Sequence, residues 1–561
     1  MDRNVIFGLI IIVTIIFTFN MMNSGEEAKA VETPKKEATK PKTLVDTSSK
    51  LATVSFPTRD SSFVWKKDQI SYTFTTIGGK IKSVDLHQFK TYSKKPLVLF
   101  FNQKIGYEFD DKGVKTSSST LPFSPTIENE KIIFTAITPR GTTVKHIFQN
   151  FKKDGSNEFI VQIDGNTSNS VVFSAEMTTP PQEKDLEEER FKSTIHYSTT
   201  EGDHDYINER KEDTENLEEK LKWISFKQKY FNSSFVFSEG INNAQLTTKN
   251  GLDSSSVKTM SFKGEVPLKN GQVSMVFHFG PSKFYDLKEV GYGLENQVYL
   301  GWNLLSVINE YVILPIFTII NKTGWSFGII ILILSIIIKA ILFPLTYKST
   351  LSTVKMRILK PEIDTIKEKI GEDQMKLQAE TMKLYSKAGV NPLGGCLPLI
   401  LQMPLLFAMF YFFPAVFELR GESFLWAEDL STYDSLIHWE TSIPVLGTHL
   451  SLFTILMTIS TLIYTRIQNE VSGATGQMKY IGYIMPVIFL GVLNSYASGL
   501  TYYYLLLNLI TFAQQAILKR SIDENKLHAQ IAENKQKGGK SKSKFQQRLE
   551  EMQAVQNKRK K

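Results

Sequence analysis

The stretch "GIIILILSIIIKAILFPLTYKST", Gly328–Thr350, is nearly continuous hydrocarbon interrupted by one basic side chain, Lys339. About 20 consecutive apolar residues suffice for a helix to cross a bilayer, so this stretch predicts a membrane span. A lysine at mid-span costs roughly 2.5–3.5 kcal/mol on insertion scales, and such residues usually face a cavity or a partner. The alternative is snorkelling, because Lys339 lies about 12 Å below the edge of the span at Tyr347, at ~1.5 Å per residue.

Apolar blocks on both sides of this stretch extend the prediction to a polytopic α-helical membrane protein with six transmembrane helices. The first block follows Arg3 and is interpreted as an uncleaved signal-anchor. Cleavage after "AKA", Ala28–Ala30, is the alternative, but this site lies well past the apolar run. The six spans are predicted at residues 1–22, 324–346, 396–417, 448–466, 481–497 and 499–518.

The basic residues of the connecting segments predict the topology. Residues 347–395 carry nine Lys/Arg, whereas residues 418–447 carry one, Arg420, among several acids that include Asp434. Because cytoplasmic loops are enriched in Lys/Arg, the first segment is predicted inside and the second, a periplasmic loop, outside. The tail, residues 519–561, has 13 Lys/Arg against 5 Asp/Glu. Both termini are therefore expected in the cytoplasm, with residues 23–300 in the periplasm.

The long segment outside the membrane is predicted to fold as a β-sandwich. Residues 23–50 are polar and charged with almost no apolar content, which is typical of a disordered linker. Residues 51–296 alternate with period two between turn residues, and Gly78–Gly79 is a hairpin signal. The charged insert 182–221 is interpreted as a solvated loop, with a weak cation site at its acids and His204 as the alternative.

Two further segments read as amphipathic helices. Residues 303–321 place Leu304, Ile308 and Val312 at helical spacing around a polar remainder, which predicts an interfacial helix, interrupted by Pro315. Residues 347–395 predict a cytoplasmic helical hairpin, against the alternative of a charged spacer. Its first helix ends at Gly371, its second ends near Gly389, and the apolar face of the first contains Leu351, Val354, Ile358, Ile363, Ile366 and Ile370.

The sequence contains no motif that is typical of an enzyme active site. The single cysteine, Cys396, excludes an internal disulfide and a four-cysteine zinc site. There is no phosphate loop and no H-E-x-x-H motif, so we expect no cofactor, no metal and no catalytic residues. Spans two to six contain no carboxylate in their apolar centres, which leaves Lys339 without an acidic partner there.

Neutral polar side chains in the spans are candidates to line a wet groove with Lys339, although each alone is more often a helix–helix hydrogen-bonding residue. This combination favours a protein that receives something acidic or polar into the bilayer. A small solute transporter or channel using Lys339 as a binding site is the main alternative, and an assembly factor acting through the β domain is another. The polar candidates are Ser335, Gln402, Thr458, Ser460, Tyr503 and Asn508.

Three stretches resemble a known family. "NPLGGCLPLILQMPLLFAMFYFF", Asn391–Phe413, is similar to the third-span signature of the YidC/Oxa/Alb family of membrane protein insertases. "KMRILKPEIDTIKEKIGEDQMKLQAETMKLYSKAGVNP" resembles the family's cytoplasmic hairpin, and "YIMPVIFLGVLNSYASGLTYYYLLLNLITFAQQ" resembles its last two spans. The anchor and large outer domain resemble the Gram-negative form.

The resemblance implies a conserved core of five transmembrane helices around a hydrophilic groove. It implies insertion, folding and assembly of integral membrane proteins in the bacterial inner membrane, alone and with the Sec translocon. The implied partners are nascent membrane proteins, the Sec translocon, membrane lipids, and the ribosome through the tail 519–561 and the hairpin. By position, Lys339 replaces the family's groove arginine, which keeps a cation but loses the planar fork. Ser335 matches the family's hydroxyl one turn earlier, and Tyr503 its sensitive tyrosine.

Overall fold

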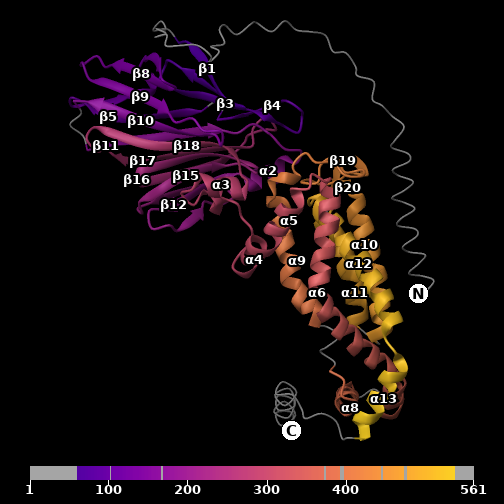
Figure 1. The fold of residues 1–561 in the computed structure, drawn as a ribbon. Coiled ribbons are helices and arrows are strands. Elements are labelled where there is room, and N and C mark those ends of the chain that lie inside the picture. The colour runs from indigo at the N-terminus through magenta and orange to yellow at the C-terminus, as the bar shows by residue number, and fades with distance from the viewer. Residues whose placement is uncertain are drawn as a thin grey trace, which may run out of the picture. The chain divides into compact units, whose positions relative to one another are not determined.

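The computed structural model describes most of the chain, which forms two compact units (Figure 1). The β unit comprises the described residues from 60 to 299, and the helical unit comprises those from 300 to 536. The predicted anchor 1–22, the linker 23–50, Cys396 and the tail beyond Gln536 lie outside the described residues. The described ranges are 60–100, 103–165, 169–371, 374–391, 397–443, 446–472 and 477–536.

The β unit contains two antiparallel sheets, as the period-two alternation predicts. The smaller sheet has the order β1-β2-β3-β4. Its strands are β1 (Ser62–Lys67), β2 (Ile70–Thr75), β3 (Lys80–Lys90) and β4 (Pro96–Leu99). The predicted hairpin lies between β2 and β3, where Gly78 and Gly79 adopt φ values of +80° and +52°. A side chain on Gly79 would meet Phe123 at 2.7 Å, so this turn requires glycine.

The larger sheet has 14 strands, in the order β6-β5-β11-β17-β16-β18-β10-β9-β8-β7 with four more branching from β16 through β14 and β15. The strands are β5 (Lys104–Asp111), β6 (Val114–Ser117), β7 (Ser124–Glu128), β8 (Lys131–Ile137), β9 (Thr143–Gln149), β10 (Ser156–Asp164), β11 (Ser170–Thr178), β12 (Thr194–Thr199), β13 (His204–Tyr206), β14 (Asp213–Leu217), β15 (Leu221–Lys227), β16 (Phe231–Asn250), β17 (Lys258–Pro267) and β18 (Gln272–Pro281).

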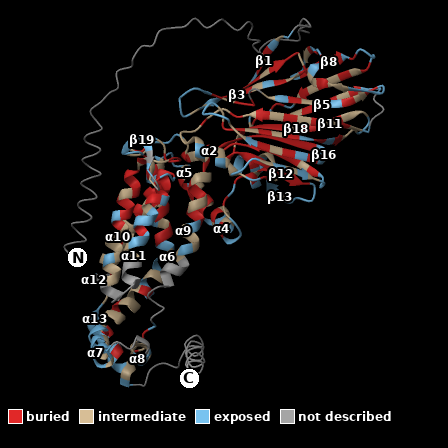
Figure 2. Cartoon of the chain, turned by 180° about the vertical axis from the view of Figure 1, so that it is seen from behind, coloured by how far each residue is buried: buried red, intermediate tan, exposed pale blue. Residues whose placement is uncertain are grey.

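Aromatic side chains fill the space between the sheets. Phe74 of β2 is fully buried and lies with its ring centroid 5.0 Å from that of Phe148 on β9 and 5.8 Å from that of Phe134 on β8. Alternating buried and partly exposed residues along β8, β9 and β11 show the face that each strand turns to this core (Figure 2). The β-sandwich prediction is confirmed at this level.

The interpretation of residues 182–221 as a solvated loop is wrong. They contain helix α2 (Leu186–Lys192) and strands β12, β13 and β14, and β12 is buried along its whole length. Specific partners accommodate the acidic side chains: Glu188 pairs with Lys229 at 2.7 Å, and the buried carboxyl group of Glu189 accepts hydrogen bonds from the backbone of Gln182 and Glu183. In the described residues no group of three or more His, Cys, Asp or Glu is placed to hold a metal ion.

The helical unit contains apolar helices, polar helices and a small β-hairpin. A short helix, α3 (Phe284–Val290), precedes it at the end of the β unit. The elements of the helical unit are α4 (Leu304–Ile308), the π-helical η3 (Asn309–Ile313), α5 (Leu314–Asn321), α6 (Phe327–Ile358), α7 (Lys360–Ile370), α8 (Gln374–Lys387), α9 (Leu397–Ala415), β19 (Ile437–Ile443), β20 (Gly447–Leu450), α10 (Leu452–Ser472), α11 (Gln477–Leu493), α12 (Ser498–Ser521) and α13 (Glu524–Gln536). Helices α7, α8 and α13 are polar. Short 3-10 turns occur at η1 (Ser118–Thr120), η2 (Leu294–Gln297) and η5 (Phe417–Leu419).

Helix α12 lies against three other helices, α6, α9 and α10, while α11 packs on α10. Within the described ranges two helical segments are long and apolar enough to cross a membrane, residues 304–321 and 327–358. Shorter apolar helices occur at residues 402–415 and 482–493. The number of six spans remains a prediction.

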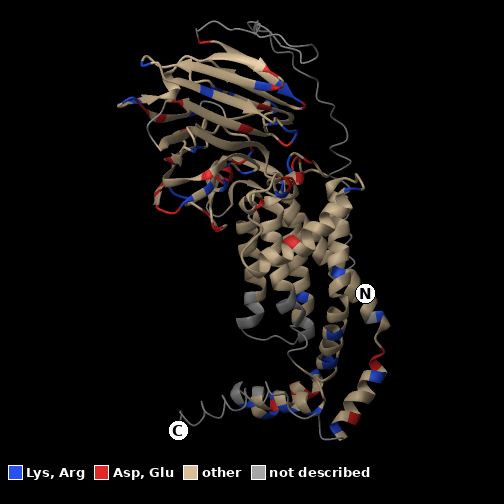
Figure 3. Ribbon diagram, turned by 60° about the vertical axis from the view of Figure 1, so that its left-hand side comes forward, with Lys and Arg blue, Asp and Glu red and all other residues tan. Residues whose placement is uncertain are grey.

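The predicted hairpin begins later than expected. Residues 347–358 continue helix α6 without a break, so the first helix of the hairpin is α7 alone, which contacts α8. The helix ends near Leu359 because Pro361 lies in the first turn of α7. Lys and Arg residues are frequent along the C-terminal part of α6 and on α7, α8 and α13, where Figure 3 marks their positions on the ribbon.

Residues 303–321 are helical, as predicted, with apolar side chains on more than one face, and their position in the membrane interface stays a prediction. Leu304 and Val312 are 58% and 41% exposed, whereas Leu305, Asn309 and Phe317 are buried. The buried face is set by α9, because the Asn309 side chain donates hydrogen bonds to the carbonyl oxygens of Leu300 (2.7 Å) and Ala408 (2.8 Å). The π-helical turn η3 leads directly into Pro315 at the start of α5, so the proline does not interrupt the segment.

Candidate functional site

Lys339 is buried on helix α6, where its side chain is held by helix α12. The residue is 6% exposed, and its Nζ donates a hydrogen bond to Thr511 Oγ1 at 2.8 Å. No ion pair joins Lys339 to a carboxylate in the part of the chain that the structure describes. Its resting partner is therefore a neutral oxygen, which leaves the charge of the ammonium uncompensated.

Thr511 is fixed by its own helix. Its hydroxyl donates to the carbonyl oxygen of Leu507 at 2.6 Å, which turns an oxygen lone pair toward Lys339. The amide of Gln514 adds a second link between the helices, donating to the carbonyl oxygen of Lys339 at 3.4 Å. The sequence reading missed both residues. Thr511 follows Asn508 by three positions, so helical periodicity would have placed it on the same side of α12.

Ser335 lies one turn before Lys339 and is fully buried. Its hydroxyl donates to the carbonyl oxygen of Ile331 at 2.7 Å, four residues earlier in α6. This is the intrahelical bond by which serine is accommodated in an apolar helix. In this state the hydroxyl is used by its own helix and not by Lys339.

Asn508 links α12 to α10. Its side-chain amide donates hydrogen bonds to Ser460 Oγ at 2.8 Å and to Thr461 Oγ1 at 2.9 Å. The structure thus brings two of the polar candidates, Asn508 and Ser460, into direct contact. A third, Thr458, bonds within α10 to the carbonyl oxygen of Thr454 at 2.8 Å. These contacts match the helix–helix role that such residues most often have.

Tyr503 and Gln402 are placed differently from each other. Tyr503 is fully buried against Phe413, with ring centroids 5.6 Å apart, and its hydroxyl has no hydrogen-bond partner among the described residues. A buried unpaired hydroxyl is costly, so this group is available to a polar ligand. Gln402 is half-buried on α9, and no hydrogen bond links it to the other four predicted site residues. Tyr504, the residue after Tyr503, donates a hydrogen bond from its hydroxyl to the carbonyl oxygen of Leu406 at 3.2 Å.

Asp434 is a buried residue that the sequence reading counted only as a loop acid. Its carboxylate accepts hydrogen bonds from the backbone N–H groups of Leu452 and Phe453, from Ser451 Oγ and from Trp426 Nε1, at 2.5–3.0 Å. The two backbone donors belong to the first turn of α10, so Asp434 caps that helix from the loop that precedes it, 18 positions before Leu452. The loop 418–447 is thereby tied to the helices.

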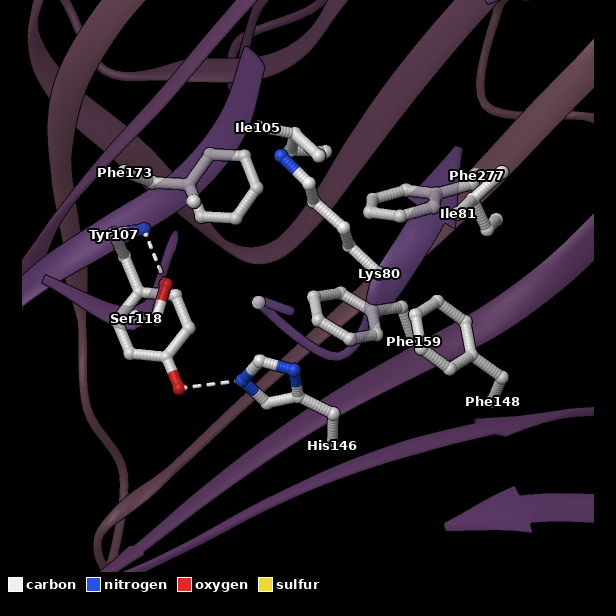
Figure 4. A pocket seen from close by; sticks show the side chains of 12 residues that line it. Lys80, Ile81, Ile105, Tyr107, Ser118, His146, Phe148, Phe159, Phe173 and Phe277 are labelled. Carbon is white, nitrogen blue, oxygen red and sulfur yellow. Dashed lines mark hydrogen bonds between the residues drawn. The ribbon is translucent and has the colours of Figure 1, made fainter. Parts of the chain in front are cut away.

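The β unit contains a small pocket with a volume of about 20 Å³ (Figure 4). His146 lies at its wall, bonded to Tyr107 Oη at 2.7 Å and to the carbonyl oxygen of Gly79 at 2.8 Å. Burial lowers the pKa of His146 to about 4, so the ring is neutral near pH 7. The space holds roughly one water molecule, which makes this a packing feature of the core.

Comparison with known proteins agrees with this architecture. The family model of the 60Kd inner membrane protein matches residues 317–526, and that of the YidC periplasmic domain matches residues 64–314. The membrane protein insertase YidC of Amoebophilus asiaticus (strain 5a2) is 32% identical over 583 residues, which cover 97% of this chain and 96% of that one. This chain belongs to the YidC family of membrane protein insertases.

Other YidC proteins show the same similarity along the chain. The insertase YidC of Parabacteroides distasonis is 37% identical over 528 residues, covering 88% of this chain and 82% of its own length. A solved structure of an active YidC insertase with its first transmembrane domain is 20% identical and covers 82% of this chain and 93% of that one. Its TM-score is 0.32, so the family assignment rests on the sequence relatives.

Proposed function

We propose that this chain inserts, folds and assembles integral membrane proteins through a hydrophilic groove in its helical unit, with Lys339 as the intramembrane cation that meets an acidic residue of the client. The observation that carries the proposal is the pairing of a buried ammonium with a neutral hydroxyl, that of Thr511. A carboxylate that reaches Lys339 replaces a neutral acceptor by a charged one, and such hydrogen bonds are roughly twice as strong.

The strength of this contact suits transient binding. At an effective dielectric constant of ~20, unit charges 4 Å apart attract by about 4 kcal/mol before either group is desolvated. Desolvation offsets part of this attraction, so the client is held briefly and not trapped. Tyr503, whose buried hydroxyl has no partner among the described residues, is a second candidate for polar contact with the client. Ser335, Gln402 and Asn508 complete the proposed lining of the groove.

Release of the client requires no chemical step. The apolar segment of the client gains transfer free energy as it leaves the groove for lipid, at about 25 cal/mol for each Å² of apolar surface removed from water. That gain is specific to hydrophobic segments, because polar segments lose hydration instead. The client itself therefore provides the driving force, and no nucleotide or cofactor enters the proposal.

The remaining parts supply delivery and orientation. In the proposed topology both termini and the hairpin are cytoplasmic and the β unit is periplasmic, with six spans in all. The basic residues on α7, α8 and the tail 519–561 would receive clients from the ribosome, since phosphate attraction needs only clustered Lys/Arg. The β unit would act as an accessory, including as a docking site for the Sec translocon.

Reconstitution in liposomes with a small client that has an acidic N-terminal tail tests the proposal. Lys339→Ala should lower insertion of this client, whereas Lys339→Arg should retain it because the charge is kept. Equal insertion by the parent and both variants would refute a role for the cation. Flux measurements of small solutes through the same liposomes address the transporter alternative, for which the proposal expects none above the lipid background.

A further inference from the structure

The first part of the C-terminal tail is folded onto the hairpin. Helix α13 places Ile531 in a buried apolar cluster with Leu359, which follows α6, and with Ala388 and Val390, which follow α8. Ile531 is separated from these residues by more than 140 positions of sequence. The partly buried side chains around the cluster are Met356, Ile358, Leu384 and Tyr385. Helix α13 therefore completes this apolar cluster at the ends of α6 and α8.

Polar contacts hold both ends of α13 in register. At its C-terminal end Lys535 Nζ lies 2.6 and 2.7 Å from the two carboxylate oxygens of Glu362 on α7. At its N-terminal end Glu524 pairs with Arg357 at the end of α6. Exposed ion pairs are individually weak, so these pairs set the position of α13 while apolar burial supplies the stability.

The turn after α8 is shaped to receive α13. Gly389 has a φ of +67°, and a side chain there would lie 2.7 Å from Nδ2 of Asn534. The same Asn534 amide donates a hydrogen bond to the carbonyl oxygen of Ala388 at 3.2 Å. The close approach uses both the left-handed backbone of glycine and its missing side chain.

Helix α13 and the two ends of the hairpin, at Leu359 and at Ala388–Val390, depend on each other for stability. Helix α7 contains no buried residue of its own, and α13 has 13 residues, of which Leu527 and Ile531 are buried. Isolated helices of this length are marginal in water, and most helical stability in proteins comes from packing of the apolar face. Loss of α13 therefore exposes the cluster and loosens the hairpin.

The charges divide the tail into two parts. Helix α13 is balanced, with Glu524 and Glu533 against Lys526 and Lys535. Residues 537–561 carry nine Lys/Arg and two Glu. We infer that α13 is an intrachain clamp that fixes the hairpin α7–α8 to the C-terminal end of α6, and that it works separately from the basic residues 537–561. The inference does not rest on the role of Lys339.

Hydrogen exchange of the full-length protein and its variants in lipid nanodiscs tests the clamp. Truncation after Gln536 should leave exchange in α7 and α8 unchanged, because α13 remains. Truncation after Asp523, and the single change Ile531→Asp, should each accelerate exchange there by about ten-fold or more, as expected when a local unit opens. Exchange in α10 reports whether the helical unit remains folded in every variant.

A charge swap adds a control within the folded protein. Lys535→Glu places two carboxylates together and should accelerate exchange in α7 by less than truncation after Asp523 does, because an exposed pair is weak, and the double variant Lys535→Glu with Glu362→Lys should restore the parent rate. Exchange that is unchanged after truncation at Asp523 would overturn the inference. Equal acceleration by both truncations would also overturn it, because the effect would then belong to residues 537–561.

Discussion

Lys339 of α6 donates a 2.8 Å hydrogen bond to Thr511 of α12, and this bond joins the buried cation to a neutral partner. Thr511 in turn donates to the carbonyl oxygen of Leu507, so its remaining acceptor capacity faces Lys339. The cation is thus satisfied as a hydrogen-bond donor in the resting protein while its charge remains without a counter-ion among the described residues.

Replacing the partner of Lys339 should cost stability. Thr511→Val keeps the shape of the side chain but leaves the ammonium without its acceptor, for which we expect a loss of about 1–3 kcal/mol in the free energy of unfolding. Thr511→Ser keeps the hydroxyl and should be close to the parent. Chemical or thermal unfolding in detergent measures both. In a Lys339→Met background the valine change should cost little, and an undiminished cost there would contradict the pairing.

Asp434 should be important for the stability of the helical unit. Asp434→Ala removes the acceptor of two backbone N–H groups in the first turn of α10 and of two side-chain donors, and we expect a loss of about 2 kcal/mol or more. The exposed Glu440 in the same loop provides the control, because Glu440→Gln removes a charge without removing a cap. The thermal midpoint of the helical unit, measured by hydrogen exchange in α10 at increasing temperature, should fall for Asp434→Ala and not for Glu440→Gln.

The β unit should lose stability in mild acid through its buried histidines. Burial lowers the pKa of His146 and that of His278 to about 4, below the usual unfolded value of ~6.5. Between these values the unfolded chain binds more protons than the folded one, so stability falls as pH falls from ~6.5 to ~4. Each histidine contributes up to ~1.4 kcal/mol per pH unit in that window.

A matched comparison isolates this effect. Glu189, whose pKa burial raises to about 8, acts in the opposite sense, so the measured quantity is the difference between the parent and His146→Gln. The variant should be less stable than the parent at pH 7, because Tyr107 and Gly79 lose their imidazole partner, and the gap should narrow toward pH 4.5. A gap that stays constant with pH would show that His146 does not titrate as described.

Local sequence patterns predicted the helices and strands better than they predicted the contacts between them. Alternation along β8 and β9 predicted strands, because one face of each packs on the core, and the glycine pair at Gly78 predicted the turn. The buried face of residues 304–321 was not predictable, because apolar side chains occur on several sides and the contact of Asn309 with α9 decides which side is buried. A single helical pattern cannot show that contact.

In the candidate site, too, single residues could be predicted from the local sequence, but their contacts could not. Lys339 was recognised from its apolar surroundings in the sequence alone. Its hydrogen bond to Thr511 depends on the packing of α6 against α12, and the two residues are 172 positions apart in the sequence. Asp434 looked like one more acid in a polar loop, and its burial follows only from where α10 begins. The start of the hairpin was misplaced because the periodicity of residues 351–358 is equally that of an extended α6.

A double-mutant cycle in reconstituted liposomes tests the central claim most directly. It compares insertion of a client with an acidic tail and the same client with the acid changed to its amide, by the parent protein and by Lys339→Ala. The account predicts that Lys339→Ala slows the acidic client by about ten-fold or more, equivalent to ~1.4 kcal/mol, and changes the amide client little. An equal loss for both clients, or no loss for either, would contradict a charge contact between Lys339 and the client.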